Sequence, residues 1–214
     1  TMGEGGFVAC KTKHQEIVAR SFREWGRGCY CVGKKANLLK NGSCTKRFSN
    51  WLTELPNEIF DHKYVYDEIG YNLKPIELQA SIGLEQMKKL PTIHSRRKEN
   101  HKALFDAFKP YEEFFILPKA TDKSNPSWFA FAVTIKDNAP FKRKDIVNFL
   151  ENKKIQTRPY FAGNIMLQPA YEGLMDKNDV IKNYPNARKV TTDTFFLGTS
   201  PVITDIQINY IEEK

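Results

Sequence analysis

The chain has 214 residues, of which 41% are hydrophobic and 13% aromatic, so it can fill a core and is not expected to be disordered. No stretch approaches the roughly 18 consecutive apolar residues of a membrane span, and no charged-then-apolar leader opens the chain, so we expect a cytoplasmic protein. The net charge of +8 favours anionic partners. The basic residues are spread thinly, however, and the densest runs, 96–98 and 142–144, are typical of solvated helix faces. Nucleic-acid binding is therefore not favoured, and an anionic ligand such as a nucleotide-sugar diphosphate would explain the positive charge equally well.

The first half of the chain is predicted to be mainly helical. A glycine-rich turn leads into a short strand at 7–9, and apolar residues at helical spacing predict a helix over 14–25. The segment 29–50 lacks periodicity and is predicted to be a loop. Pro75 is predicted to open a second helix that runs to about residue 90, and Pro91 to separate it from a third that ends at residue 108.

The second half alternates strands and helices, which is typical of a compact α/β layer domain. Strands are predicted at 114–117, 128–135, 155–160 and 195–198, and helices at 143–153 and 181–194. Thr204 and Gln207 have the spacing of a capping box, which predicts a last helix at the end of the chain. The opening Thr1-Met2 suggests either the remnant of a tag or a chain cut from a longer protein.

All four cysteines lie in the first 44 residues, at Cys10, Cys29, Cys31 and Cys44. Without a secretory context, such clustering favours a metal or iron–sulfur site over disulfides. The spacings fit no standard zinc knuckle. Cys10 follows the predicted strand and is interpreted as a small, buried core residue.

The segment G-Y-N-L-K-P-I-E-L-Q-A-S-I-G-L-E-Q-M-K-K-L (70–90) resembles a stretch of the DegT/DnrJ/StrS sugar aminotransferases. In that family the stretch joins the large cofactor domain to the small C-terminal domain. The resemblance implies that Asn72 reaches the phosphate of pyridoxal or pyridoxamine phosphate in the neighbouring subunit, for which an amide N–H is a suitable donor. By itself, the pattern is also compatible with a core helix that follows a turn-forming asparagine.

Further motifs resemble the iron–sulfur 3-dehydratase subgroup, which acts on CDP-4-keto-6-deoxyglucose. They are M-G-E-G-G (2–6), S-F-R-E-W-G-R-G-C-Y-C (21–31), C-T-K-R-F (44–48), D-H-K-Y-x-Y (61–66), P-S-W-F-A-F (126–131) and F-A-G-N-I-x-x-Q-P (161–169). The implied fold is α/β, the C-terminal part of an aspartate-aminotransferase-type (fold type I) enzyme. We expect the end of the large domain at 1–74, connecting helices at 75–109 and the small α/β domain at 110–214.

The resemblance implies that Cys29, Cys31 and Cys44 hold a [2Fe–2S] cluster, because thiolates are its usual ligands. The subgroup pattern is C-x-C-x7-C, whereas twelve residues separate Cys31 from Cys44 here. An insertion in a loop costs little free energy, so the ligand set stays a hypothesis. The fourth cysteine ligand of the subgroup would precede Thr1.

The resemblance also implies a substrate surface and a missing catalytic group. Arg158, Tyr160, Phe161 and Asn164 would face the sugar nucleotide, and an arginine there could hold a phosphate bidentately, although a surface arginine at a strand end is equally compatible. The subgroup's catalytic histidine, a lysine in the aminotransferases, would lie about two residues before Thr1, so we assign no catalytic residue in this chain.

None of the four histidines is assigned as that base. His62 lies in the D-H-K-Y motif and could approach the site, whereas His14, His94 and His101 are predicted to lie on helix surfaces.

The implied enzyme is a homodimer that removes the C3 hydroxyl of a CDP-linked 4-keto-6-deoxyhexose, with electrons from an NADH-dependent iron–sulfur flavoprotein reductase. Its products feed the dideoxysugars of the lipopolysaccharide O antigen. Two alternatives remain open at this point, a sugar-nucleotide aminotransferase of the same family and an inactive or interaction fragment. A chain of this kind without the rest of its large domain is expected to expose apolar surface.

Overall fold

The computed structural model describes residues 2–29 and 44–214, and the chain divides into two compact units, Thr1–Lys88 and Lys89–Lys214. The division falls inside helix α2 (Glu77–Phe108), which contributes its first part to one unit and its second part to the other. Within the described residues, no helix is both long and apolar enough to cross a membrane. The three-part division predicted from the sequence stays a prediction.

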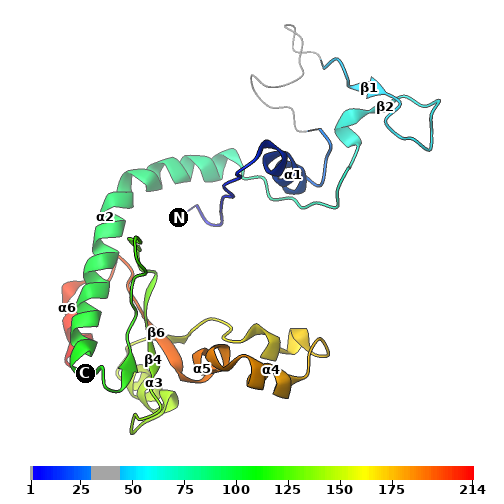
Figure 1. Cartoon of the computed structure of the whole chain (residues 1–214). Coiled ribbons are helices and arrows are strands. Elements are labelled where there is room, and N and C mark those ends of the chain that lie inside the picture. The colour runs from blue at the N-terminus through cyan, green and yellow to red at the C-terminus, as the bar shows by residue number, and fades with distance from the viewer. Residues whose placement is uncertain (1, 30–43) are drawn as a thin grey trace. The chain divides into compact units, whose positions relative to one another are not determined.

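The described residues of the unit Thr1–Lys88 form one complete α-helix and one short hairpin-like pair of strands (Figure 1). Helix α1 (Lys13–Arg23) confirms the predicted first helix, and it begins with a capping box between Thr12 and Gln15. Strands β1 (Phe48–Ser49) and β2 (Phe60–Asp61) pair antiparallel, and the 3-10 turn η2 (His62–Tyr64) follows. The predicted loop at 29–50 therefore ends in a strand, and its residues 30–43 lie outside the described residues.

Two predictions at the start of the chain are wrong. Residues 7–9 form no strand, and Phe7 and Val8 are 89% and 78% exposed. A strand needs a neighbour to accept its backbone hydrogen bonds, and no described residue pairs with this segment. Cys10 is half-buried rather than buried, as it follows this exposed segment.

Helix α2 continues through Pro91, so the predicted break there is wrong. A proline inside a helix removes one backbone hydrogen bond and costs about 3 kcal/mol. Tertiary packing after the proline supports the helix, because Asn100, His101 and Leu104 are all buried in the unit Lys89–Lys214. The helix begins at Glu77, where the Gln79 side chain accepts a hydrogen bond from the backbone N–H of Ile76 (3.0 Å).

The unit Lys89–Lys214 is built on a four-stranded antiparallel sheet in the order β3-β4-β6-β5 (Figure 1). The strands confirm the four predicted ones within a few residues. They are β3 (Phe115–Ile116), β4 (Ala130–Ile135), β5 (Thr157–Pro159) and β6 (Thr194–Gly198). The 3-10 turn η3 (Lys109–Tyr111) connects α2 to β3.

One face of this sheet forms the hydrophobic core. Alternate residues of β4 and β6 point to it, and helices α2, α3 (Arg143–Asn152) and α6 (Asp205–Glu212) cover it. The buried cluster consists of Leu104, Phe115, Phe131, Val133, Ile135, Leu150, Ile155, Phe195, Leu197 and Ile208. The capping box of Thr204 and Gln207 at the start of α6 is confirmed.

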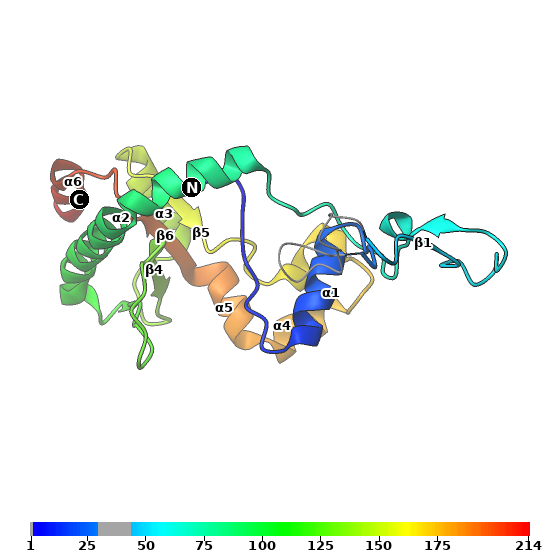
Figure 2. The ribbon, with the colours of Figure 1, turned by 90° about the horizontal axis from the view of Figure 1, so that it is seen from above.

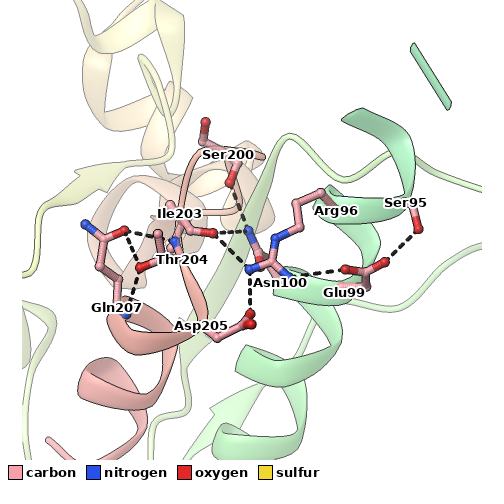
Figure 3. Close-up of polar contacts among 9 residues, drawn as sticks. All are labelled: Ser95, Arg96, Glu99, Asn100, Ser200, Ile203, Thr204, Asp205 and Gln207. Atoms are coloured by element: carbon pink, nitrogen blue, oxygen red, sulfur yellow. Dashed lines mark hydrogen bonds and ion pairs between the residues drawn. The ribbon is translucent and has the colours of Figure 1, made fainter. Parts of the chain in front are cut away.

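Polar contacts join helix α2 to the segment that leads into α6 (Figure 3). Arg96 forms a salt bridge with Asp205 (2.6 Å) and donates to the carbonyl of Ile203 (3.1 Å). The amide of Asn100 donates to the carbonyl of Ser200 (2.9 Å). Arg96 is only 26% exposed, so the interpretation of residues 96–98 as a solvated face is wrong for this side chain.

The predicted helix at 181–194 is divided into α4 (Lys177–Asn183) and α5 (Pro185–Asp193). Pro185 opens α5 and disfavours a helical backbone at Tyr184, which breaks the run. Figures 1 and 2 show that α5 leads directly into β6. The two 3-10 turns η4 (Ile165–Leu167) and η5 (Pro169–Tyr171) lie between β5 and α4.

Candidate functional site

The segments 24–28 and 65–73 interlock through their backbones. The N–H of Trp25 donates to the carbonyl of Tyr71 (2.8 Å), and the N–H of Gly28 donates to that of Val65 (3.0 Å). A Cβ on Gly26, whose φ is +83°, would lie 1.7 Å from the carbonyl oxygen of Glu68. A side chain at Gly70 would collide with the backbone of residues 25 and 26. Only glycines allow this approach, so the W-G-R-G and G-Y-N motifs form one structural element.

Asn72 is held by this element. It forms an isolated antiparallel bridge with Glu24, and the adjacent Leu73 donates its N–H to the carbonyl of Arg23 (3.0 Å). Its side chain is exposed. A fixed backbone with an exposed amide is suited to donating a hydrogen bond to a phosphate, so the geometry fits the predicted role, which stays a prediction.

Cys29 follows Gly28 and therefore stands at the end of the interlocked element opposite to Asn72. Cys29 and Cys44 are both half-buried, and they frame the segment 30–43. Cys31 belongs to that segment and lies outside the described residues. Among the residues that are described, no three His, Cys, Asp or Glu side chains come together as metal ligands. The cluster ligand set therefore stays a prediction.

The residues after Cys44 are fixed by an ion pair and a ring stack. Arg47 forms a salt bridge with Asp61 (2.9 Å), and hydrogen bonding to Arg47 lowers the pKa of that carboxyl group. His62 stacks on Trp51 with 4.1 Å between ring centroids. His62 is thus part of a half-buried aromatic pair, and the structure assigns it no proton acceptor or donor role.

The other predicted site residues lie in the unit Lys89–Lys214, where the chain leaves β5. Arg158 is exposed on β5, and Phe161 adopts a left-handed backbone with φ of +47°. The turn is closed by hydrogen bonds from the N–H of Phe161 to the carbonyl of Pro159 (2.7 Å) and from the N–H of Gly163 to that of Tyr160 (3.0 Å). A left-handed non-glycine residue costs about 1–2 kcal/mol, and such strain is typical of functional sites.

Asn164 ends this turn and is only 6% exposed. Its backbone N–H donates to the Thr191 hydroxyl (2.7 Å), and its Oδ1 accepts the N–H of Met166 (3.1 Å). Its Nδ2 is buried and has no hydrogen-bond partner among the described residues. A buried amide donor without an acceptor is costly, so the geometry fits the predicted substrate-binding role of Asn164, which stays a prediction.

An aromatic cluster that the sequence analysis did not assign to the site adjoins the turn. Phe129, Phe161 and Phe196 lie within 5.6–6.1 Å of one another by ring centroids. Phe196 is the direct cross-strand partner of Arg158. Arg97 of α2 lies over the Phe129 ring at 5.8 Å. The P-S-W-F-A-F motif contained Phe129, but nothing local to the sequence placed it beside Phe161 or Arg97.

His101 was predicted to lie on a helix surface, which is wrong. Its side chain is 6% exposed and stacks on Trp128 with 4.0 Å between ring centroids. Burial lowers its pKa to about 4. His14 is exposed and His94 half-buried, both on helices. His101 is therefore a neutral core residue at neutral pH.

Comparison with solved structures identifies the architecture first. The chain superposes on a GDP-4-keto-6-deoxy-D-mannose-3-dehydratase from E. coli with bound hydrated PLP, with a TM-score of 0.64 and 25% identity, over 92% of this chain and 46% of that one. An aminotransferase from Psychrobacter cryohalolentis gives the same TM-score at 18% identity, over 90% of this chain and 46% of that one. The fold is that of part of a fold-type I, pyridoxal-phosphate-dependent aminotransferase-like enzyme.

Residues 1–214 match the DegT/DnrJ/EryC1/StrS aminotransferase family, and the chain belongs to it. It is 39% identical over its whole length to the lipopolysaccharide biosynthesis protein RfbH of Salmonella typhimurium. It is equally similar, at 39%, to a dTDP-4-dehydro-2,6-dideoxy-D-glucose 3-dehydratase of Saccharopolyspora spinosa. The chain spans 47% and 44% of these two relatives.

Proposed function

We propose that the chain is the C-terminal portion of a sugar-nucleotide 3-dehydratase that uses pyridoxamine or pyridoxal 5′-phosphate and a [2Fe–2S] cluster. Its proposed substrate is CDP-4-keto-6-deoxyglucose, and its product serves dideoxysugar and O-antigen biosynthesis. The enzyme is proposed to act as a homodimer. The relatives named as 3-dehydratases and as a lipopolysaccharide biosynthesis protein support this class of reaction.

The observation that carries the proposal is the interlock of segments 24–28 and 65–73. It fixes Asn72 at one end of a single element and Cys29 at the other. A proposed ligand of the cofactor phosphate and a proposed ligand of the cluster thus belong to the same structural element. An aminotransferase without an iron–sulfur cluster does not require a cysteine at this position. The presence of Cys29 on the same element as Asn72 therefore favours the dehydratase.

The chain's residues would bind and orient rather than transfer the proton. Asn72 would donate an amide hydrogen bond to the cofactor phosphate, and Arg158 would pair with a phosphate of the sugar nucleotide. The exposed ring of Phe161 would exclude water from the sugar. When bound, the pyridoxamine form supplies a primary amine with an electron-accepting ring, and the cluster carries single electrons.

The overall reaction consumes two electrons and two protons. The C3–O bond of the sugar breaks, and one proton leaves with the hydroxyl as water. Two electrons and a proton then restore a C–H bond at C3. We propose that an NADH-dependent iron–sulfur flavoprotein reductase supplies these electrons one at a time. The base that moves the proton is not assigned to any residue of this chain.

The test is an iron and acid-labile sulfide assay, with a visible spectrum, on the complete polypeptide purified without oxygen. We expect about two irons per protomer, as a [2Fe–2S] cluster requires. Cys29→Ser and Cys44→Ser should each abolish the charge-transfer bands. Cys10→Ser is the matched control, and it should leave both iron content and spectrum unchanged.

The outcomes separate the alternatives. Iron-free protein that transfers an amino group from glutamate to a 4-keto sugar nucleotide would replace the dehydratase with a sugar aminotransferase. Iron-free protein that neither binds pyridoxal phosphate nor turns over a sugar nucleotide would indicate an inactive or interaction fragment. If Cys10→Ser loses its iron while Cys29→Ser and Cys44→Ser keep theirs, the proposed ligand set is wrong and Cys10 is a ligand.

A further inference from the structure

Among the described residues, the unit Lys89–Lys214 has three buried side-chain nitrogens without a hydrogen-bond partner. One is Nε2 of His101, which belongs to the core stack with Trp128, and the other two are groups that can only donate. These two are Nε of Arg97 and Nδ2 of Asn164. The neighbouring Arg96 is different, because it pairs with Glu99 and Asp205. Buried donors are almost always satisfied in folded proteins, so the two unpaired groups indicate a ligand that carries acceptors.

Arg97 borders the aromatic cluster, and Asn164 belongs to the turn that carries one of its rings, Phe161. The Arg97 guanidinium lies 5.8 Å from the centroid of Phe129, and that ring lies 6.0 Å from Phe161. Asn164 follows Phe161 by three residues and ends the same turn. Phe129 and Phe161 remain 63% and 66% exposed. Two exposed rings thus lie near the Arg97 guanidinium and on the turn that ends at the buried Asn164 amide.

The charge at this position is positive, although Arg158 interacts electrostatically with Glu151 and, after the hydrogen bonds from Thr157, contributes to the lowered pKa of that carboxyl group. Neither Arg97 nor Arg158 forms a salt bridge with any described residue, although most ionic side chains nearby on α2 do. Phe196 links the two arginines, since it contacts Phe129 at 6.1 Å and is the strand partner of Arg158. Two guanidinium groups without a salt bridge around one aromatic cluster favour a ligand with more than one phosphate and a planar ring.

We infer that Arg97 is a second phosphate-binding arginine, which acts with Arg158 and the Asn164 amide to hold the diphosphate of a nucleoside diphosphate sugar. The inference rests on the proposed function for the assignment of this site to the sugar nucleotide. It adds a residue of α2 that the sequence motifs do not include. The Phe129 and Phe161 rings provide the apolar contact surface beside the phosphates.

The experiment is a calorimetric titration of the purified protein with CDP, inorganic pyrophosphate, cytidine and pyridoxal phosphate. Arg97→Gln should weaken CDP and pyrophosphate binding at least about tenfold, because a charge-assisted hydrogen bond to phosphate is lost. Arg97→Lys keeps the charge and should lose less affinity for CDP and pyrophosphate than Arg97→Gln does. Lys102→Gln is the matched control, since it removes the same charge from an exposed position of α2 that pairs with Asp106, and it should change binding less than about twofold.

Cytidine should bind weakly and equally to the wild type and Arg97→Gln, and circular dichroism melting should show that the variant remains folded. CDP binding by Arg97→Gln at wild-type affinity, or no CDP binding by the wild type, would overturn the inference. A larger loss for pyridoxal phosphate than for CDP would also overturn it, in favour of the cofactor phosphate. The iron assay depends on the cysteines and not on Arg97. Missing iron would therefore overturn the proposed function, while the CDP titration would still decide the role of Arg97.

Discussion

The two units of the chain are stabilised by different interactions. In Lys89–Lys214 a continuous hydrophobic cluster lies between a sheet face and three helices. In Thr1–Lys88 no hydrophobic side chain of the described residues is buried, and backbone hydrogen bonds join segments 24–28 and 65–73. The unit Lys89–Lys214 is thus stabilised by its own hydrophobic core. The unit Thr1–Lys88 instead presents apolar side chains such as Ile69, which is 94% exposed.

The largest expected effect breaks the core of Lys89–Lys214. Phe131 is fully buried, and Phe131→Ala should lower the free energy of unfolding by about 3–5 kcal/mol, because it removes buried apolar surface and leaves a cavity. Urea denaturation followed by circular dichroism measures the change. Ile69→Ala in the other unit is the control and should stay within about 0.5 kcal/mol of the wild type. Equal losses in the two variants would contradict the contrast between the units.

The next effect depends on pH. Burial lowers the pKa of His101 from 6.5 to about 4, so the unfolded chain binds a proton at a higher pH than the folded chain does. The free energy of unfolding of Lys89–Lys214 should therefore be highest above about pH 6.5. It should decrease by about 3 kcal/mol in total as the pH falls to about 4. His101→Phe, which keeps a ring beside Trp128, should flatten this part of the pH profile.

The control for that profile is His14→Gln, since His14 is exposed on α1. This variant should keep the wild-type decrease between pH 6.5 and 4. A profile of His101→Phe that still matches the wild type over this range would assign the acid sensitivity to other groups.

A smaller, local effect is expected in Thr1–Lys88. Gly26→Ala places a Cβ against the carbonyl of Glu68 and forces a left-handed backbone on alanine, which should cost about 2 kcal/mol or more of local stability. Hydrogen exchange of the amides at 65–73 should become faster, while exchange in β4 and β6 stays the same. Gly3→Ala is a close control, because Gly3 has the same φ of +83° with no atom near the added Cβ. Unchanged exchange at 65–73 in Gly26→Ala would falsify the interlock.

The smallest effect is expected from removing the threonine of the capping box, which occurs once in each unit. Thr12 caps α1 and Thr204 caps α6, each with a glutamine three residues later. Thr204→Ala should lower the global free energy of unfolding of Lys89–Lys214 by about 1 kcal/mol, because the buried Ile208 ties α6 to the core. Thr12→Ala should speed hydrogen exchange only within α1. Global destabilisation by Thr12→Ala would mean that α1 is more strongly coupled than its exposed surroundings indicate.

Local signals in the sequence predicted most elements of Lys89–Lys214. The β4 and β6 strands, helix α3 and the capping box at Thr204 were all predicted correctly. The alternation and capping patterns that define them act between residues a few positions apart. The predicted strand at 7–9 failed because a strand also needs a neighbour, and the chain supplies none among its described residues.

The sequence by itself determined the family and the capping box that begins α6. Tertiary structure alone decided that α2 continues through Pro91, that His101 is buried against Trp128 and that Arg97 lies over Phe129. These three features depend on contacts between residues far apart in the chain or on packing that outweighs a local hydrogen bond. Periodicity and propensity describe neighbours along the chain, so they carry no information about such contacts.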